Sequence, residues 1–127
     1  MNADNESLNG LSGAVIGCAF TVHNTLGAGF LEKVYGNAPA RELGKRGLAV
    51  VQQRGMRVVY DGTVVGEYYA DLLIEEKLLV ELKTVKALEE AHCAQCMNYL
   101  RATGLSLCLL LNFSKPRLEI KRVANYL

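Results

Sequence analysis

Apolar residues in the first part of the chain follow a helical spacing. They recur at intervals of three or four positions: Leu11, Val15, Cys18, Val22 and Leu26. This spacing predicts a helix over residues 11–26, and a second stripe predicts another over residues 30–46. Pro39 lies inside the second stripe, so we expect that helix to kink or restart there. The polar start, residues 1–9, is expected to be flexible.

Strand patterns follow the two helices. We expect strands over residues 48–53, 56–60, 63–74, 78–83, 105–111 and 117–123. Asp61-Gly62 is a strong hairpin signal, and Gly66 is a candidate bulge position. A third helix is expected over residues 89–102. The order helix, helix, four strands, helix, two strands predicts a mixed α/β domain with helices packed on a central sheet.

The hairpin predicted over residues 71–83, DLLIEEKLLVELK, carries charges within an apolar frame. Because side chains alternate across a strand, Glu81 and Lys83 share one face of the second arm, and its other face is apolar. On the first arm Asp71 lies on the charged face, and the same alternation turns its neighbour Ala70 to the apolar side.

Register decides whether the two acids of this hairpin meet. A three-residue loop over residues 75–77 pairs Ile74 with Leu78 and brings Asp71 opposite Glu81, with Cβ atoms about 5 Å apart. A two-residue loop would put Glu81 on the other face of the sheet. We predict the three-residue loop.

Two carboxylates at this spacing make a candidate metal site. Close carboxylates repel each other, so burial raises one pKa unless a cation intervenes. Mg²⁺ prefers carboxylate and carbonyl oxygens, which Asp71 and Glu81 would supply. Lys83 adds positive charge that can orient a water or stabilise developing negative charge. A surface ion cluster on a solvated sheet face is the alternative, and the pattern alone leaves both open.

Composition and charge limit the number of domains and the classes of protein to which the chain can belong. The 127 residues are half hydrophobic and carry a net charge of +1, which indicates one domain over residues 1–127. Near-neutral charge argues against a strongly cationic protein that coats nucleic acid. No apolar run reaches about 18 residues, so no membrane span is expected. The acidic start does not resemble a signal peptide, which favours reduced thiols and a cytoplasmic location.

Metal binding by cysteine is the weaker of two interpretations. Cys93 and Cys96 form a single pair near His92, whereas a structural zinc site needs four ligands. Buried or half-buried thiols are therefore favoured over metal or redox chemistry.

Two short motifs carry a resemblance. Asp71, nine residues and then Glu81-Leu82-Lys83 resemble the core of the PD-(D/E)xK nuclease superfamily. Residues 29–35, GFLEKVY, match the GxxExxY signature that names one small bacterial family within it. The similarity extends from about residue 10 to residue 123 and includes residues 109–113, LLLNF.

This resemblance implies a restriction-endonuclease-like three-layer α/β/α core with a central mixed β-sheet. It implies that Asp71 and Glu81 ligate Mg²⁺ or Mn²⁺ together with the backbone carbonyl of Leu82. Lys83 would position the attacking water. Glu32 resembles the additional acidic residue that reaches the metal, often through water.

The third predicted helix carries a further motif. Residues 95–99, QCMNY, resemble the QxxxY motif of RecB-like nucleases. Gln95 and Tyr99 are four apart and share a helical face, from which they would reach a phosphate or hold Lys83. Alternatively, Gln95 caps the sheet edge and Tyr99 belongs to the core.

Other positions are open between a role in the site and a plain structural role. Tyr35 of the signature either organises the site or forms an exposed helix pair with Glu32. His92 either contacts a phosphate or is a partly buried histidine. Gly36 and Pro39 depart from the family pattern, which puts the aim of Glu32 in question.

The function implied is a metal-dependent phosphodiesterase that hydrolyses DNA, or less readily RNA, with metal-activated water. A catalytically silent nuclease-fold module that binds nucleic acid or a protein partner is the alternative. Sequence-specific cleavage would need a homodimer or a partner. Several basic residues are candidates to hold a nucleic-acid backbone, although each is also a plausible surface charge: Lys33, Arg41, Lys45, Lys86, Lys115, Arg117, Lys121 and Arg122.

Overall fold

The computed structural model describes residues 3–126, with side chains from residue 7 onward. Three helices and five strands follow one another: α1 (Ala3–Leu26), α2 (Glu32–Lys45), β1 (Val50–Tyr60), β2 (Thr63–Ile74), β3 (Leu78–Lys83), α3 (Glu90–Thr103), β4 (Leu107–Asn112) and β5 (Glu119–Ala124). The prediction of two strands over residues 48–53 and 56–60 is wrong, because β1 continues through Arg54-Gly55. The other predicted elements are present, with ends shifted by a few residues.

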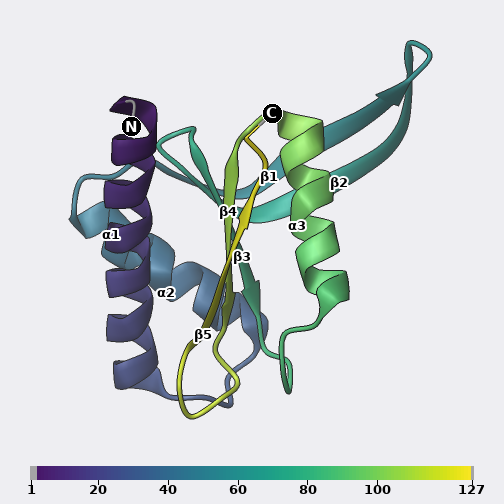
Figure 1. Cartoon of the computed structure of the whole chain (residues 1–127). Helices are drawn as coiled ribbons and strands as arrows, with labels where there is room; N and C mark the ends of the chain where they lie inside the picture. Colours follow the sequence, from purple (N-terminus) through teal and green to yellow (C-terminus); the bar gives the residue numbers. More distant parts are fainter. Residues whose placement is uncertain (1–2, 127) are drawn as a thin grey trace.

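The strands form one mixed sheet in the order β1-β2-β3-β4-β5. Strands β3 and β4 pair in parallel, and the other neighbours pair antiparallel. Helix α3 makes the crossover between the parallel strands and covers one face, while α1 and α2 cover the other (Figure 1). The predicted three-layer α/β/α architecture is confirmed.

Two apolar clusters fill the spaces between the layers. One joins α1 and α2 to the sheet through Leu78, Val80 and Leu82. The other joins α3 to the opposite face and includes Leu79. Because helices cover both faces of β3 and β4, these strands are buried along nearly their whole length.

Both N-terminal helices differ from expectation. Helix α1 begins at Ala3, so residues 3–9 are helical rather than irregular, and residues 1–2 lie outside the described part of the chain. Helix α2 runs through Pro39 without a break. Its buried residues Tyr35, Pro39 and Leu43 recur every four positions, and this packed stripe offsets the backbone hydrogen bond that proline cannot make.

The far half of the β1–β2 hairpin projects from the body as a two-stranded ribbon (Figure 1). We call residues 54–68 the ribbon. Its register shifts between Val58 and Val59, whose partners are Gly66 and Val64, so the unpaired residue is Val65, next to the bulge position expected at Gly66.

The strand alternation also breaks at the base of the ribbon. Gln53 has a φ of 54°, and neither Gln53 nor Asp71 is among the paired residues of the β1–β2 ladder. Beyond this point Ala70 packs in the α3 cluster, whereas Leu72 packs in the α1–α2 cluster. The prediction that Ala70 faces the same side as Leu72 is therefore wrong, because the irregularity inverts the alternation.

Candidate active site

The hairpin between β2 and β3 has the predicted register. Ile74 pairs with Leu78, and the ladder continues to Leu72 and Val80. Extended by one residue, it sets Asp71 opposite Glu81. Glu75 and Glu76 occupy the left-handed region, with φ of 52° and 56°, which lets residues 75–77 close the turn.

The two acids are held by each other's strands. The Asp71 backbone N–H donates to Glu81 Oε1 at 2.9 Å, and the Leu82 N–H donates to Asp71 Oδ2 at 2.7 Å. Gln53 Nε2 reaches Asp71 Oδ1 at 3.4 Å from β1. These contacts fix the orientation of both carboxylates where the backbone ladder ends.

Burial gives the pair unusual electrostatics. Glu81 is only 3 % exposed. Desolvation, followed by the charge of Asp71, raises the pKa of Glu81 to about 8, against the lowering effects of the Asp71 N–H and the Lys83 ammonium. A buried carboxylate beside a second one therefore favours a proton, or another cation, over the bare anion.

Lys83 is held by the helix that covers this face. Its Nζ donates to Gln95 Oε1 at 3.3 Å, and both side chains are partly buried. Gln95 thus contacts the lysine, which is one of the two arrangements expected from the sequence. The ammonium lies close enough to Glu81 for its charge to oppose the rise of the Glu81 pKa.

Tyr99 lies deeper on the same helix. It is 4 % exposed, and its ring centroid is 5.9 Å from that of Tyr68. Burial, Glu81 and Asp71 all raise the pKa of Tyr99, in that order of importance. Tyr99 is a core residue that also borders the acids, so both interpretations of it describe part of its surroundings.

The backbone of β3 directs the Leu82 carbonyl toward the strand edge where Asp71 lies. In a strand, the N–H and C=O of one residue point to the same edge. The Leu82 N–H points toward Asp71, so the Leu82 carbonyl points toward the acids as well. The Lys83 carbonyl points the other way and accepts the Phe113 N–H at 2.9 Å.

Glu32 approaches from the first turn of α2. Partial burial and the charge of Asp71 raise the pKa of Glu32, and Lys83 and the Thr84 N–H oppose that rise. The charge of Glu32 therefore interacts with that of Asp71. Glu32 does not, however, form a group of three metal-ligating side chains with Asp71 and Glu81. Gly36, one turn further along α2, lies over the side chain of Leu82, with room for no more than a small group.

Tyr35 is buried, so its interpretation as an exposed partner of Glu32 is wrong. Its hydroxyl donates to the Gly27 carbonyl and accepts the Phe30 N–H, and its ring stacks on Phe113 at 4.6 Å. These contacts fasten the loop between α1 and α2, from which α2 and Glu32 begin. Tyr35 does not line the site, but it organises the approach of Glu32.

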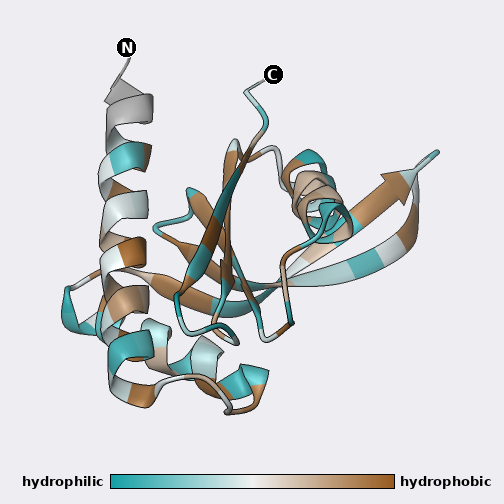
Figure 2. Ribbon diagram, turned by 60° about the horizontal axis from the view of Figure 1, so that its bottom comes forward, coloured by the Kyte–Doolittle hydropathy of each residue, from teal (hydrophilic) through white to brown (hydrophobic). Residues whose placement is uncertain are grey.

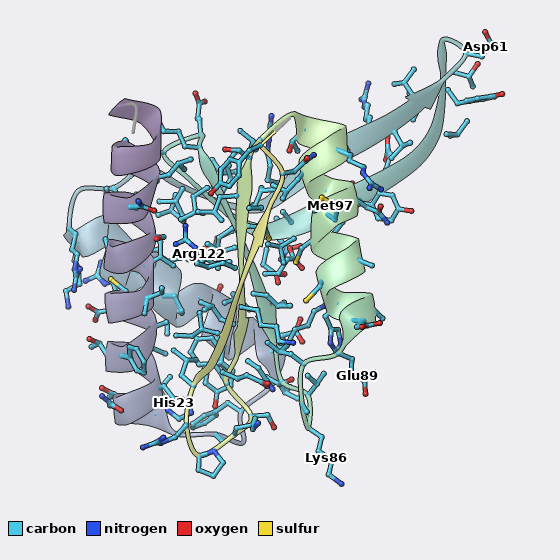
Figure 3. The ribbon with its side chains drawn as sticks, in the orientation of Figure 1. His23, Asp61, Lys86, Glu89, Met97 and Arg122 are labelled. Carbon is cyan, nitrogen blue, oxygen red and sulfur yellow. The ribbon has the colours of Figure 1, made fainter. Side chains whose placement is uncertain are left out.

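His92 caps the helix that carries Gln95. Its Nδ1 accepts the Glu89 backbone N–H at 2.9 Å at the start of α3. This capping contact was not foreseen from the sequence. Lys86 projects from the connector at the same end of the molecule as Glu89 (Figure 3).

Asn112 and Glu119 support the connector between Lys83 and α3. Asn112 is fully buried, and its amide exchanges hydrogen bonds with the Val85 N–H and carbonyl at 3.1 and 2.8 Å. Glu119 Oε1 accepts from Asn112 Nδ2 and from the Leu88 N–H, both at 3.1 Å. The stretch 109–113, which contains Asn112, carries the family resemblance but was given no role. Buried polar residues at the ends of apolar strands were the available signal.

The donor set suits a divalent cation in part. Asp71 and Glu81 offer two carboxylates, and Leu82 offers a carbonyl, which are hard oxygen ligands. Among residues with described side chains, no group of three or more His, Cys, Asp or Glu is close enough to hold a metal. The fit is therefore a two-carboxylate site, with Glu32 nearby. The cysteines are free and buried or half-buried, as predicted.

A comparison with protein-family models matches residues 9–123 to the PD-(D/E)XK nuclease superfamily. The chain belongs to this superfamily. Its members generally use divalent metal ions, which agrees with the oxygen donors of Asp71 and Glu81. A comparison with curated proteins finds no match.

Two solved structures are similar to this superfamily member. SSO0001 has 17 % sequence identity and a TM-score of 0.58, over 76 % of this chain and 51 % of that one. An alkaline exonuclease from Laribacter hongkongensis, LHK-Exo, has 16 % identity and a TM-score of 0.44, over 73 % of this chain and 55 % of that one. The chain thus spans about half the length of these proteins. In residues 3–126, no helix has the length and hydrophobicity needed to cross a bilayer.

Proposed function

We propose that this superfamily member is a Mg²⁺- or Mn²⁺-dependent nuclease that hydrolyses phosphodiester bonds in DNA, within the GxxExxY group. The carrying observation is the buried Glu81 beside Asp71, with Lys83 held against them by Gln95. The supporting observation for the GxxExxY group is the anchoring of the α1–α2 loop by Tyr35.

Each residue has a defined task in this proposal. Asp71, Glu81 and the Leu82 carbonyl would hold the ion, and Glu32 would contribute through a water. When bound, the ion lowers the pKa of a water and offsets negative charge on the phosphate. Lys83 orients the attacking water, and Gln95 keeps the lysine extended toward it. The reaction is direct hydrolysis with no covalent enzyme intermediate.

The surface offers modest support for a nucleic-acid backbone. Lys33 follows Glu32, and Lys86 is exposed in the connector after Lys83, so both lie beside the acids in the chain. Arg122 is engaged elsewhere, donating to Ser12 Oγ at 3.0 Å on α1. We therefore assign backbone contacts to Lys33 and Lys86 rather than to the whole set of basic residues.

A silent nuclease-fold module is the competing proposal. Keeping Glu81 buried beside Asp71 carries a desolvation and repulsion cost, which a module with no cation to bind would have no reason to bear. Metal binding separates the two proposals first. Calorimetric titration of Mg²⁺ and of Mn²⁺ into the wild type should show a site that Asp71→Asn removes. Glu67→Gln, on the same strand but in the ribbon, should leave it intact. Equal binding by Asp71→Asn would overturn the metal assignment.

Cleavage tests the activity. Single-stranded, nicked and branched DNA, with RNA for comparison, should be cut only when Mg²⁺ or Mn²⁺ is present. Lys83→Met should lower the rate by about 10²- to 10⁴-fold, the usual range for a group that manages a proton or water. Lys77→Met, at the opposite end of β3, is the matched control and should cut normally. Activity that survives Lys83→Met would show that the cutting comes from another site.

A further inference from the structure

A buried asparagine lies beside the lysine of the candidate site. Strands β3 and β4 are mainly hydrophobic (Figure 2), and Asn112 is the polar residue at the end of β4. It is the partner of Lys83 in the last pair of the parallel ladder, and it has no exposed surface. Burying a side-chain amide is costly unless its polar atoms are bonded, so the partners of Asn112 indicate which segment it holds in place.

The side chain of Asn112 continues the ladder where the backbone ladder ends. The Lys83 carbonyl accepts the Phe113 N–H at 2.9 Å, and the chain then leaves the sheet. Val85 donates its N–H to Asn112 Oδ1 at 3.1 Å, and its carbonyl accepts from Asn112 Nδ2 at 2.8 Å. Both backbone groups of Val85 are thus bonded to one side chain, which fixes the start of the connector, residues 84–88.

Glu119 of β5 holds the other end of the connector. Its Oε1 accepts from Asn112 Nδ2 and from the Leu88 N–H, both at 3.1 Å, so it also orients the asparagine amide. The hydrogen bond from Asn112 lowers the pKa of Glu119, and the Leu88 N–H acts in the same direction. Hydrogen bonds to an ionised carboxylate are stronger than those between neutral groups. Asn112 and Glu119 therefore fix the two ends of the connector together.

The connector joins three residues of the candidate site. Lys83 directly precedes it, and the Thr84 N–H bonds the Glu32 carboxylate. Helix α3, which carries Gln95, begins two residues after the connector ends. The contact between Lys83 Nζ and Gln95 Oε1, at 3.3 Å, therefore joins groups on either side of the connector. A shift at either end of the connector would move the two groups relative to each other.

We propose that Asn112, oriented by Glu119, is a positioning residue of the candidate site, which sets the place of Lys83 by fixing both ends of the connector. This role rests on the proposed nuclease function, in which Lys83 orients the attacking water. The acids Asp71 and Glu81 are held separately, by bonds between their own strands. Loss of the Asn112 contacts should therefore displace the lysine and slow the chemical step while metal binding is kept.

Asn112→Asp is the most selective variant, because it keeps the shape of the side chain and the Oδ1 acceptor. It loses both donated bonds and sets a second carboxylate against Glu119. On the DNA that the wild type cuts fastest, kcat should fall about 10²-fold, as for a group displaced by about 1 Å. The KM and the dissociation constant for Mg²⁺ should stay unchanged. Asn24→Asp, on the exposed surface of α1, makes the same chemical change and should alter none of these values.

Glu119→Gln in the Asn112→Asp background is the rescue. The glutamine amide donates to the introduced carboxylate and keeps an oxygen for the Leu88 N–H, so one acid and one amide again face each other. Part of the lost kcat should return. Turnover is measured at a temperature where circular dichroism shows every variant fully folded, so that a loss of stability alone does not lower it.

A second readout follows the lysine without any cleavage. In protein with ¹³C-labelled lysine, the NMR signal of the Lys83 side chain is the one that Lys83→Met removes. Asn112→Asp should shift this signal, and the added Glu119→Gln should move it back. If Asn112→Asp does not fold, Glu119→Ala replaces it, because the Glu119 side chain is 23 % exposed and its loss should be tolerated. It should shift the Lys83 signal in the same direction by a smaller amount.

Failure of the nuclease function and failure of the positioning role give different results. A wild type that cuts nothing would overturn the nuclease function, and the Lys83 signal would still decide the positioning role. An unmoved Lys83 signal in folded Asn112→Asp, or in Glu119→Ala where that variant replaces it, would overturn the positioning role whatever the rate of cleavage. So would a normal kcat in folded Asn112→Asp, or a loss of Mg²⁺ affinity as large as the loss of kcat.

Discussion

Strand β2 is buried over its last residues and exposed over its first ones. Leu72 and Ile74 have no exposed surface, whereas Val64 and Val65 are 45 % and 58 % exposed. All four are apolar and lie in one continuous strand. The buried half lies between the helices of the two faces, and the exposed half projects beyond them (Figure 1). Coverage by other elements, rather than strand propensity, separates the two halves.

Charges behave differently in the two halves for the same reason. In the ribbon, Arg57 and Glu67 lie 3.8 Å apart with side chains 72 % and 54 % exposed, a pair that water screens and that contributes little. At the base, Glu81 faces Asp71 away from water, and its pKa rises to about 8. At the base, the buried Glu81 carboxylate and the neighbouring Asp71 repel each other, and a bound cation would reduce that repulsion. The ribbon has no comparable buried charge.

Core packing should show the largest difference between the halves. Leu72→Ala removes a fully buried side chain and should lower the free energy of unfolding by about 2–5 kcal/mol. Val64→Ala in the ribbon should change it by no more than about 0.5 kcal/mol. Urea unfolding followed by circular dichroism measures both. Losses of similar size would mean that another surface covers the ribbon in solution.

The next largest difference between the base and the ribbon should be a pH dependence of stability, which comes from Glu81 beside Asp71 at the base. Folded Glu81 keeps its proton up to about pH 8, whereas the unfolded chain releases it near the ordinary value of 4.5. The unfolded state therefore binds fewer protons between these values, so stability falls as pH rises through that window. The total fall is of the order of a few kcal/mol.

Glu81→Gln should remove this slope in metal-free protein and raise stability at pH 8, because the amide keeps an oxygen for the Asp71 N–H without adding charge. Glu67→Gln in the ribbon should leave the slope unchanged. Thermal unfolding in EDTA across pH 5–9 gives the comparison. Parallel curves for wild type and Glu81→Gln would contradict the buried-pair description.

The sequence predicts β3 and its hairpin with β2 better than the junction between the base and the ribbon. Alternation along residues 78–83 assigned both faces of β3, and the three-residue loop set the register that brings Asp71 to Glu81. That prediction succeeded because one register alone buries the apolar set. The prediction of the side that Ala70 faces is wrong, because it depends on the positive φ of Gln53. Glutamine is not a residue type that predicts a positive φ.

Side-chain bonds formed at long range were also beyond the sequence. Gln95 was expected to hold Lys83 or reach a phosphate, and only the docking of α3 on the sheet shows the first contact. The support of residues 84–88 by Asn112 and Glu119 joins segments about 30 positions apart. The kink predicted at Pro39 is absent, because the packing of Tyr35 and Leu43 outweighs local helix propensity in α2.

Tyr35 extends the comparison to the helices that cover the base. Tyr35→Phe keeps the ring stack on Phe113 but loses both hydroxyl contacts, so it should lower the free energy of unfolding by about 1–2 kcal/mol. The loop before Glu32 should loosen, and half-maximal cleavage should then require more metal. Tyr60→Phe in the ribbon is the control, with little expected change, because Tyr60 is largely exposed. A Tyr35→Phe protein with normal stability and normal metal dependence would argue against the anchoring role.

The smallest predicted change in the free energy of unfolding is that of Gly55→Ala. It tests whether the ribbon unfolds together with the base. Gly55 pairs with Tyr69, and a Cβ there would lie 3.5 Å from the ring, which is ordinary contact. Gly55 is not among the positive-φ glycines, so Gly55→Ala should stabilise by about 0.4–1 kcal/mol through the unfolded chain. Gly36→Ala in α2 supplies a reference of about 0.8–1 kcal/mol in the covered body.

The two glycine variants distinguish two kinds of ribbon. If ribbon and body unfold as one unit, Gly55→Ala raises the global free energy of unfolding as Gly36→Ala does. If the ribbon opens by itself, Gly55→Ala leaves global unfolding unchanged and only slows hydrogen exchange of the ribbon amides. The first result is expected, because Met56 of the ribbon is buried in the apolar cluster that joins α3 to the sheet. An unchanged global free energy of unfolding for Gly55→Ala would show instead that the ribbon opens by itself.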